Sequence, residues 1–238
     1  MVNRRMKILS LTISLVAAVV FGAGPVRAQY STPPPTAEEN EATYNTAIEN
    51  RTAAIITLLK LDDAAKSTRV HDIIIAQYQT LKARDAAIDT LLKLQGKEVN
   101  YTNRASLLAS ESKPLHDRFL AKLASELNAG QLEIVKDKMT YNKVQVTYDA
   151  YCSIVPGLTD ADKTEVLTVL REAREEAIDG GSAGEKSAVF QKYKDQINDY
   201  LNAHGHDVAK AYKDWEAKQQ VANKPDSGSA PKTTEPAK

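Results

Sequence analysis

The segment that decides the fold is LNAGQLEIVKDKMTYNKVQVTYDAYCSIVPGLTDADKT, Leu127 to Thr164. It opens with a helix start, because Asn128 is followed three residues later by Gln131, the spacing of a capping box. The same pattern returns at Thr159. Between these two starts, tyrosines and β-branched residues replace the helical periodicity, and Pro156-Gly157 indicates a break in the chain. We therefore predict an irregular crossing segment between two helices.

On both sides of this segment the sequence is typical of amphipathic helices. The longest is predicted to begin at Asp62 and to end at Gly96. A polar connection is predicted from Asn100 to Ser112, and the next helix is predicted to carry Pro114 in its first turn. The seam of the longest helix alternates spacings of four and three, as in packed bundles; it consists of Val70, Ile74, Gln77, Leu81, Arg84, Ile88 and Leu91. The predicted fold class is all-α, an antiparallel helical bundle of about six to eight helices with one irregular crossing segment.

The two ends of the chain differ from the helical middle. Residues 1–28 combine a basic start, an apolar run and the small-x-small sequence Val26-Arg27-Ala28, which predicts a signal peptide. We expect a disordered Pro-rich linker at 29–40, the helical domain at 41–218 and a disordered tail at 219–238. The protein is thus expected to be exported to the periplasm or the cell exterior, with no stable membrane insertion after signal removal.

Charge and composition exclude several functions. The chain has 31 basic and 31 acidic residues; without the four basic residues of the leader its net charge is about −4. We therefore expect no nucleic-acid partner. Cys152 is the only cysteine, so no internal disulfide is possible. The four histidines lack a metal-binding spacing and no glycine loop suits a phosphate, so we expect no metal and no cofactor.

Five residues are candidates for a ligand-binding site. Arg174 interrupts an apolar stripe, and Arg84 occupies a seam position beside Asp85. A guanidinium group there must be paired, or must face a cavity, because an unpaired buried charge is too costly. Either both arginines form structural ion pairs, or they line a cleft and bind a carboxylate such as that of an acidic sugar. Tyr141 and Tyr148 flank the irregular segment, where they belong to the core or stack on a sugar ring.

Carboxylates on the predicted Thr159 helix are a further feature. Glu172, Glu175, Glu176 and Asp179 follow the spacings of a solvated, ion-paired face. Glycoside chemistry needs two carboxylates that face each other across a cleft. One helix cannot supply both, so a partner such as Asp72, Asp85 or Asp149 would be required.

Two stretches carry a resemblance to a known family. MTYNKVQVTYDAYCSIVPGLTDADK and LREAREEAIDGGSAGEKSAVFQKYKDQINDYL resemble family 3826, a secreted, all-helical bacterial domain of unknown function. The resemblance covers most of Ala42 to Trp215. It implies an extracytoplasmic helical domain, often encoded near genes of polysaccharide breakdown, and it carries over no catalytic residues. The stretch from Leu127 to Gln131 is also similar to a short motif of small periplasmic stress chaperones, with Asn128 in place of its threonine.

We therefore expect a binding or accessory protein linked to polysaccharide breakdown, in preference to an enzyme. Its partner would be an oligosaccharide or a protein of a polysaccharide-degrading system. The alternative is a carbohydrate-active hydrolase or lyase with a cleft around Tyr141, Tyr148 and Arg174. A second alternative is a periplasmic chaperone, which would need an open apolar patch.

Overall fold

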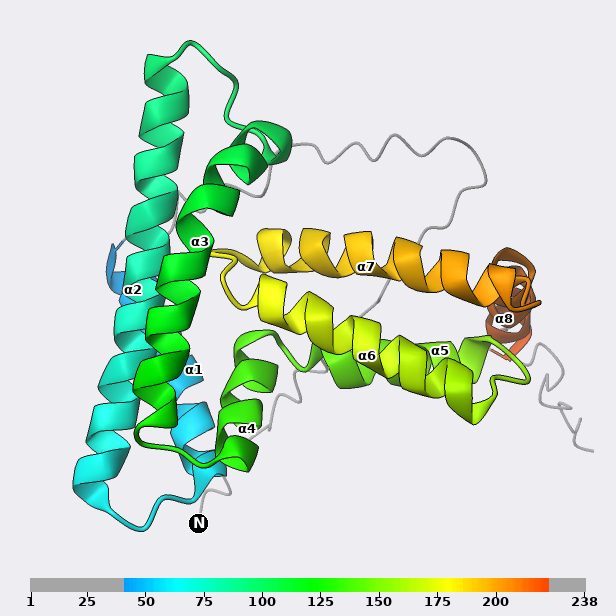
Figure 1. The fold of residues 1–238 in the computed structure, drawn as a ribbon, viewed down its shortest axis with the longest axis horizontal. Coiled ribbons are helices and arrows are strands. Elements are labelled where there is room, and N and C mark those ends of the chain that lie inside the picture. The colour runs from blue at the N-terminus through cyan, green and yellow to red at the C-terminus, as the bar shows by residue number, and fades with distance from the viewer. Residues whose placement is uncertain (1–40, 223–238) are drawn as a thin grey trace, which may run out of the picture.

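A computed structural model describes residues 41–222, and it is built from helices without a strand in that range (Figure 1). The predicted all-α fold is confirmed. The predicted signal peptide at 1–28, the predicted linker at 29–40 and residues 223–238 of the predicted tail lie outside the described residues, whereas residues 219–222, also predicted as tail, are helical. No described helix is both long enough and apolar enough to span a bilayer. The helices are α1 (Glu41–Leu59), α2 (Ala64–Leu94), α3 (Tyr101–Ala124), α4 (Ala129–Met139), α5 (Lys143–Ile154), α6 (Asp160–Ala177), α7 (Ala183–Ala203) and α8 (Val208–Ala222).

The helices form two groups, each with its own core. Helices α1 to α4 enclose the first core, in which Leu123 and Val135 are fully buried, and Ile178 from the end of α6 completes it. Helices α5 to α8 enclose the second core, around Leu170 and Leu201. Figure 1 shows α6 and α7 running crosswise to α2 and α3, so that the turn between α6 and α7 meets the first group.

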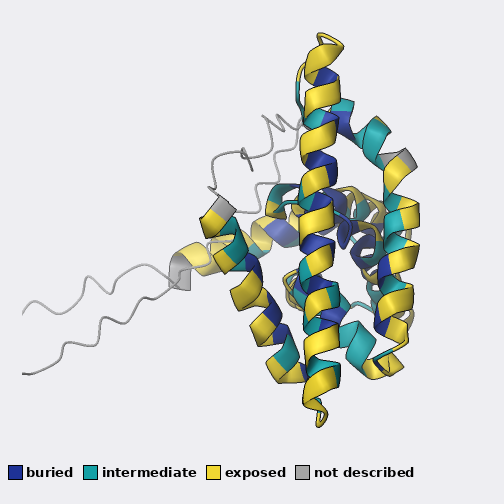
Figure 2. Ribbon diagram, turned by 90° about the vertical axis from the view of Figure 1, so that its left-hand side faces the viewer, coloured by how far each residue is buried: buried dark blue, intermediate teal, exposed yellow. Residues whose placement is uncertain are grey.

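Helix α2 follows the predicted seam closely. The N-cap of α2 is Asp63, one residue after the predicted Asp62. The Asp63 side chain accepts from the backbone N–H groups of Ala65 and Lys66 at 2.8 and 3.2 Å. Every predicted seam residue except Leu91 is buried, and Leu92 takes its place in the core. Figure 2 shows the buried positions recurring along one side of this helix while the other side is exposed.

Helix α3 corrects the prediction for residues 100–114. The stretch predicted as a polar connection is helical, because the Asn100 side chain caps it by accepting from Asn103 N at 2.9 Å. Pro114 therefore lies inside α3 and not in a first turn. Proline lacks the donor that continues the helical hydrogen bonds, and Figure 1 shows α3 bending along its length. The polar composition of this stretch reflects a solvated helix face.

The expected irregular segment is mostly helical. Thr159 and Asn128 both form the predicted capping boxes. Between them the helical path is broken at Tyr141 and Asn142, whose φ angles of 59° and 53° are left-handed. The β-branched residues that suggested irregularity lie in α5, where Val144 and Thr147 are buried. Burial against the second core outweighs their modest helix propensity.

Candidate functional site

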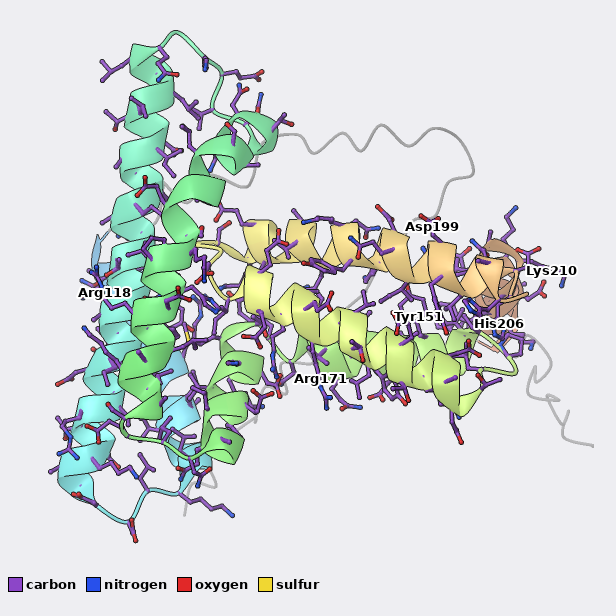
Figure 3. The ribbon with its side chains drawn as sticks, in the orientation of Figure 1. Arg118, Tyr151, Arg171, Asp199, His206 and Lys210 are labelled. Carbon is purple, nitrogen blue, oxygen red and sulfur yellow. The ribbon has the colours of Figure 1, made fainter. Side chains whose placement is uncertain are left out.

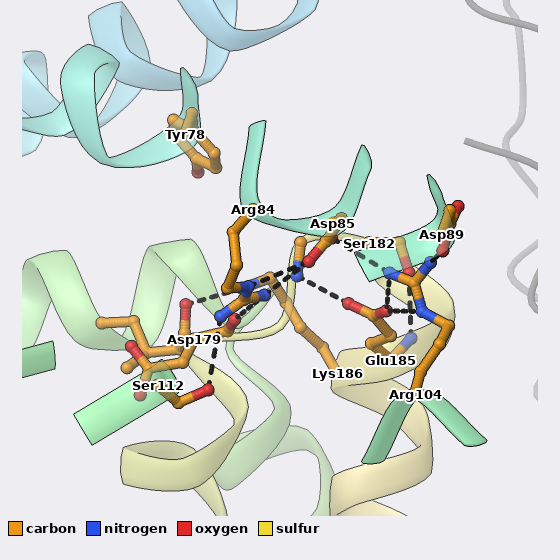
Figure 4. A network of polar contacts seen from close by, with 12 residues as sticks. Tyr78, Arg84, Asp85, Asp89, Arg104, Ser112, Asp179, Ser182, Glu185 and Lys186 are labelled. Atoms are coloured by element: carbon orange, nitrogen blue, oxygen red, sulfur yellow. Dashed lines mark hydrogen bonds and ion pairs between the residues drawn. The ribbon is translucent and has the colours of Figure 1, made fainter. Parts of the chain in front are cut away.

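A network of buried charges lies where the α6–α7 turn meets α2 and α3 (Figure 4). The turn approaches α2 closely: a Cβ atom on Gly181 would overlap Asp85 Oδ2 and lie 2.8 Å from its Cγ. Glycine is therefore required at this position for the carboxylate and the turn to share the space. The charged members, all buried, are Arg84, Asp85, Arg104, Asp179, Glu185 and Lys186.

Arg84 is bound within this network on every side. Its Nε and Nη2 donate to Asp85 Oδ1 at 3.0 and 2.8 Å, and Nη2 also donates to the backbone oxygen of Asp179 at 2.8 Å. Nη1 donates to Ser112 Oγ at 3.3 Å. Burial and the nearby Glu185 raise the pKa of Asp85 to about 6, although Arg84 acts in the opposite direction. The guanidinium group thus has no free face for a ligand carboxylate.

Arg104 connects α3 to α7. Its Nε and Nη2 donate to Glu185 Oε1 at 3.1 and 2.7 Å, and Nη1 donates to Asp89. Glu185 Oε2 accepts from the backbone N–H of Gly181 at 2.8 Å. Because Glu185 lies in the first turn of α7, its charge also suits the positive end of the helix dipole.

Lys186 is fully buried beside this pair. Its Nζ donates to the backbone oxygens of Ala177 and Ile178 at 3.1 and 3.0 Å. These carbonyls belong to the end of α6, which needs external donors. Burial lowers the pKa of Lys186 to about 8. The Lys186 side chain therefore stabilises the corner between α6 and α7 by binding these carbonyls, and it does not reach the surface.

A cleft of about 490 Å³ opens next to the network, between α3 and the α6–α7 corner. At its wall, His116 Nδ1 lies 3.0 Å from Asp179 Oδ2. This hydrogen bond is the main cause that raises the pKa of His116. The Asp179 side chain is 9% exposed, and its Oδ1 is buried without a hydrogen-bond partner in the described part of the chain. The cleft is lined by Ala105, Leu108, Ser112, Lys113, His116, Glu175, Glu176, Asp179, Gly180, Glu185 and Val189.

Two glutamates of α6 complete the polar wall. Glu175 binds Lys136 Nζ at 2.9 Å. Glu176 binds Lys192 Nζ at 2.9 Å and accepts from the Tyr193 hydroxyl at 2.9 Å. Both carboxylates are more than a third exposed, so each keeps acceptor capacity toward the cleft. Together with Asp179, they make the wall rich in hydrogen-bond acceptors.

Comparison with known families gives one match. Residues 45–221 match the family described as "Protein of unknown function (DUF3826)". The chain belongs to this family. No curated protein matches the sequence. The family match covers all of the helices that form the cleft, and its description assigns no activity to the DUF3826 domain.

The five candidate residues do not converge in this DUF3826 domain. Arg84 and Asp85 lie together in the buried network, directly behind the cleft wall formed by Ser112 and Asp179. Arg174 points toward α4, where it donates to Asp137 at 2.6 Å and to Glu133 at 2.5 Å, and it also binds Glu175. Its Nε is buried without a partner among the described residues. Arg174 is therefore a structural ion-pair residue between α4 and α6.

The two tyrosine candidates lie elsewhere again. Tyr141 is 40% exposed at the break before α5, and Tyr148 packs against the second core. Neither lines the cleft. The sequence does not predict His116 as a cleft residue, because its spacing from the other histidines fits no metal site and indicates no other role. Its signal was weak: a histidine on the helix that also carries Phe119 and Leu123, with its acidic partner 63 positions away.

Within residues 41–222, no cluster of three or more His, Cys, Asp and Glu side chains is arranged to hold a metal ion. The arrangement can accept hydrogen bonds, through three carboxylates, and can position one imidazole by a carboxylate. These two capacities limit what the cleft can do chemically.

Proposed function

We propose that the cleft binds a neutral, hydroxyl-rich ligand such as the end of an oligosaccharide. The observation that carries this proposal is the pair of His116 and Asp179 at the wall of the cleft, beside the exposed carboxylates of Glu175 and Glu176. Hydroxyl groups of a ligand in the cleft would donate to these two carboxylates. The imidazole of His116, which Asp179 holds in place, would bind a further hydroxyl.

The charges of the lining favour a neutral ligand over an acidic one. Lys113 binds Asp117 at 2.9 Å, and Arg84 and Arg104 are bound to carboxylates of the network. An acidic sugar would therefore meet the carboxylates of Glu175, Glu176 and Asp179, opposed by the exposed Lys113, which Asp117 already pairs, and this excess of acidic groups disfavours its binding. Sugar hydroxyls, by contrast, can donate to Glu175, Glu176 and Asp179.

Size and apolar lining also support this ligand class. A volume of about 490 Å³ falls within the range of roughly 300–1,000 Å³ that small-molecule sites occupy. Ala105 and Leu108 from α3 and Val189 from α7 form an apolar part of the wall. This wall suits the C–H groups of a sugar ring. An exported binding or accessory protein of polysaccharide breakdown is the role that we propose for it.

A hydrolase is the second candidate, and the orientation of His116 by Asp179 favours it. An imidazole held by a carboxylate is the arrangement of a general base. The two-carboxylate mechanism has less support, because all four acidic residues of the lining come from the α6–α7 corner and none from α3. Hydrolysis would release new reducing ends from a bound oligosaccharide, whereas binding alone would leave them constant.

A chaperone role lacks an observation of its own. The large apolar side chains that are exposed in the described residues lie on α1, on α2 and around the start of α5; they are Leu58, Leu91, Leu94, Tyr141 and Val146. A chaperone surface would need such residues to be contiguous.

The test is a thermal-shift screen of the purified protein against neutral oligosaccharides, with acidic ones in parallel. A ligand that binds the native state raises Tm according to RT ln(1 + [L]/Kd). We expect a rise with a neutral oligosaccharide and its loss in Asp179→Asn. A rise that persists in Asp179→Asn would move the ligand to another site.

A further inference from the structure

The two side chains of the His116–Asp179 pair come from different helix groups. His116 lies on α3, in the first group, and Asp179 lies in the α6–α7 corner, in the second. The corner is at the end of α6 and α7 opposite to His206 and Lys210 (Figure 3). Support for Asp179 from outside its own helix group therefore comes from the first group.

Arg84 on α2 provides that support, because it contacts both walls of the cleft. Its Nη2 donates to the backbone oxygen of Asp179 at 2.8 Å. Its Nη1 donates to Ser112 Oγ at 3.3 Å, and Ser112 lies one turn before His116 on the same face of α3. Arg84 thus joins the two elements that carry the pair, and it does so without lining the cleft itself.

Arg84 is in turn held in place by its neighbour on α2. Its Nε and Nη2 both donate to Asp85 Oδ1, at 3.0 and 2.8 Å, and its side chain is 6% exposed. A planar guanidinium group directs several donors at fixed partners at once, whereas an ammonium group is a point charge on a flexible stem. Lysine at position 84 would therefore keep the charge and lose this geometry.

The carboxylate of Asp179 depends on the position of its backbone. Lys186 on α7 holds the two carbonyls that precede Asp179, and Arg84 holds the carbonyl of Asp179 itself. Among the described residues, the Asp179 side chain makes one hydrogen bond, to His116, and its Oδ1 makes none. Because so little else fixes this side chain, a shift of its backbone would move it away from His116.

We infer that Arg84 is a positioning residue of the cleft, which holds Asp179 against His116 without contacting the ligand. This inference rests on the function proposed above, since it concerns the imidazole that would bind a ligand hydroxyl. Asp85 already pairs the charge of Arg84, so the contribution of Arg84 is geometric. Docking of the two helix groups and binding in the cleft are thereby coupled through one buried side chain.

The titration of His116, followed by NMR, reports this positioning in the absence of a ligand. The hydrogen bond to Asp179 is the main cause that raises the pKa of His116 above 6.5. Burial opposes this effect, and the charges of Asp179, Glu175 on α6 and Asp117 on α3 add to it. A weaker hydrogen bond lowers the pKa of His116, whereas a loss of stability alone leaves the pKa of the folded protein unchanged.

The proteins compared are the wild type, Arg84→Lys and the matched control Arg174→Lys, with His116→Asn to assign the signal. Both arginines are buried where the two helix groups meet, and both substitutions keep the charge. Arg174 contacts neither Ser112 nor Asp179. We expect the pKa of His116 to fall toward 6.5 in Arg84→Lys and to stay at the wild-type value in Arg174→Lys. An unchanged pKa in Arg84→Lys, or an equal fall in both variants, would overturn the inference.

Ser112→Ala is a second test, which holds even if Arg84→Lys folds poorly. It removes only the contact between Arg84 and α3. Ser106→Ala is its control, because Ser106 Oγ is exposed and bonds to a backbone oxygen within α3. We expect a smaller fall in the pKa of His116 in Ser112→Ala and none in Ser106→Ala. The same pKa in both serine variants would contradict the role of Arg84 as a bridge.

Affinity for a neutral oligosaccharide separates this inference from the proposed function. Arg84→Lys should weaken binding by up to about tenfold, and Arg174→Lys should leave it unchanged. Equal affinity in the wild type and Arg84→Lys would overturn the positioning role. If the wild type binds no oligosaccharide while the pKa of His116 falls in Arg84→Lys, the proposed function fails and the positioning of Asp179 by Arg84 stands.

Discussion

Arg104 and Glu185, 81 positions apart in the chain, form a buried ion pair with an Nη2–Oε1 distance of 2.7 Å. The side chains are 4% and 5% exposed. This pair ties α3 in the first helix group to α7 in the second. It therefore fixes the corner against which the cleft is formed.

Arg104→Ala should lower the free energy of unfolding by about 3–5 kcal/mol, because it leaves the buried Glu185 carboxylate without its cationic partner. Urea unfolding followed by circular dichroism measures this loss. Arg69→Ala is the matched control, since Arg69 makes a two-point ion pair with Glu126 while its side chain is 51% exposed. Comparable losses of unfolding free energy in Arg104→Ala and Arg69→Ala would show that a buried ion pair contributes no more here than an exposed one.

Gly181→Ala should destabilise the protein by about 1–3 kcal/mol, since the added Cβ collides with the Asp85 carboxylate. Gly130→Ala is the control. Gly130 lies inside α4, where an added Cβ would meet only Asn128 Oδ1 at 3.5 Å. There alanine should stabilise by about 0.5–1 kcal/mol. Thermal unfolding of the two variants gives the comparison, and a neutral Gly181→Ala would refute the close packing of the turn.

The pair of His116 and Asp179 predicts a specific dependence of stability on pH. The hydrogen bond to Asp179 raises the pKa of His116 in the folded state above 6.5. The pair therefore stabilises the fold fully below pH 6.5, and this stabilisation is lost as pH rises through the folded pKa.

The measurement is the free energy of unfolding between pH 5.5 and 8.5 for the wild type and His116→Asn. The difference between the two should shrink as pH rises. The pKa of His71 is also raised, since Asp72 and Glu49 outweigh the opposite effect of burial. Because both proteins retain His71, its contribution to the pH dependence cancels in the difference between them. A difference that is constant with pH would contradict the ion pair.

Much of the fold could be predicted because the deciding signals are local. The capping boxes at Asn128 and Thr159 need only residues three apart, and the α2 seam needs only its own periodicity. The local pattern predicts Pro114 in a first turn, whereas Pro114 lies exposed inside α3, between the buried residues Arg104 and Phe119 that pack the helix on either side of it. The same reason explains α5, where burial of Val144 and Thr147 stabilises a helix that the composition disfavours.

The candidate site was harder to predict, since its contacts join distant positions. The sequence shows that a buried Arg84 needs a partner, and Asp85 beside it supplies one. It does not show that Asp179 meets His116, or that Arg104 meets Glu185, because each pair forms only when the α6–α7 turn reaches α3. Tyr141 and Tyr148 flank the segment that the sequence predicts to be irregular, and the direction of their side chains depends on the break at Asn142.

The most direct test of the cleft is isothermal titration calorimetry with the neutral oligosaccharide that gives the largest thermal shift. Wild type, Asp179→Asn, His116→Asn and the control His204→Asn should be compared. His204 lies at the end of α7, where it contacts the Tyr200 backbone oxygen. We predict that affinity falls about tenfold or more in the two cleft variants, the loss of one hydrogen bond to a charged group, and is unchanged in His204→Asn. Equal affinity in all four proteins, or no binding by the wild type, would contradict the proposed function.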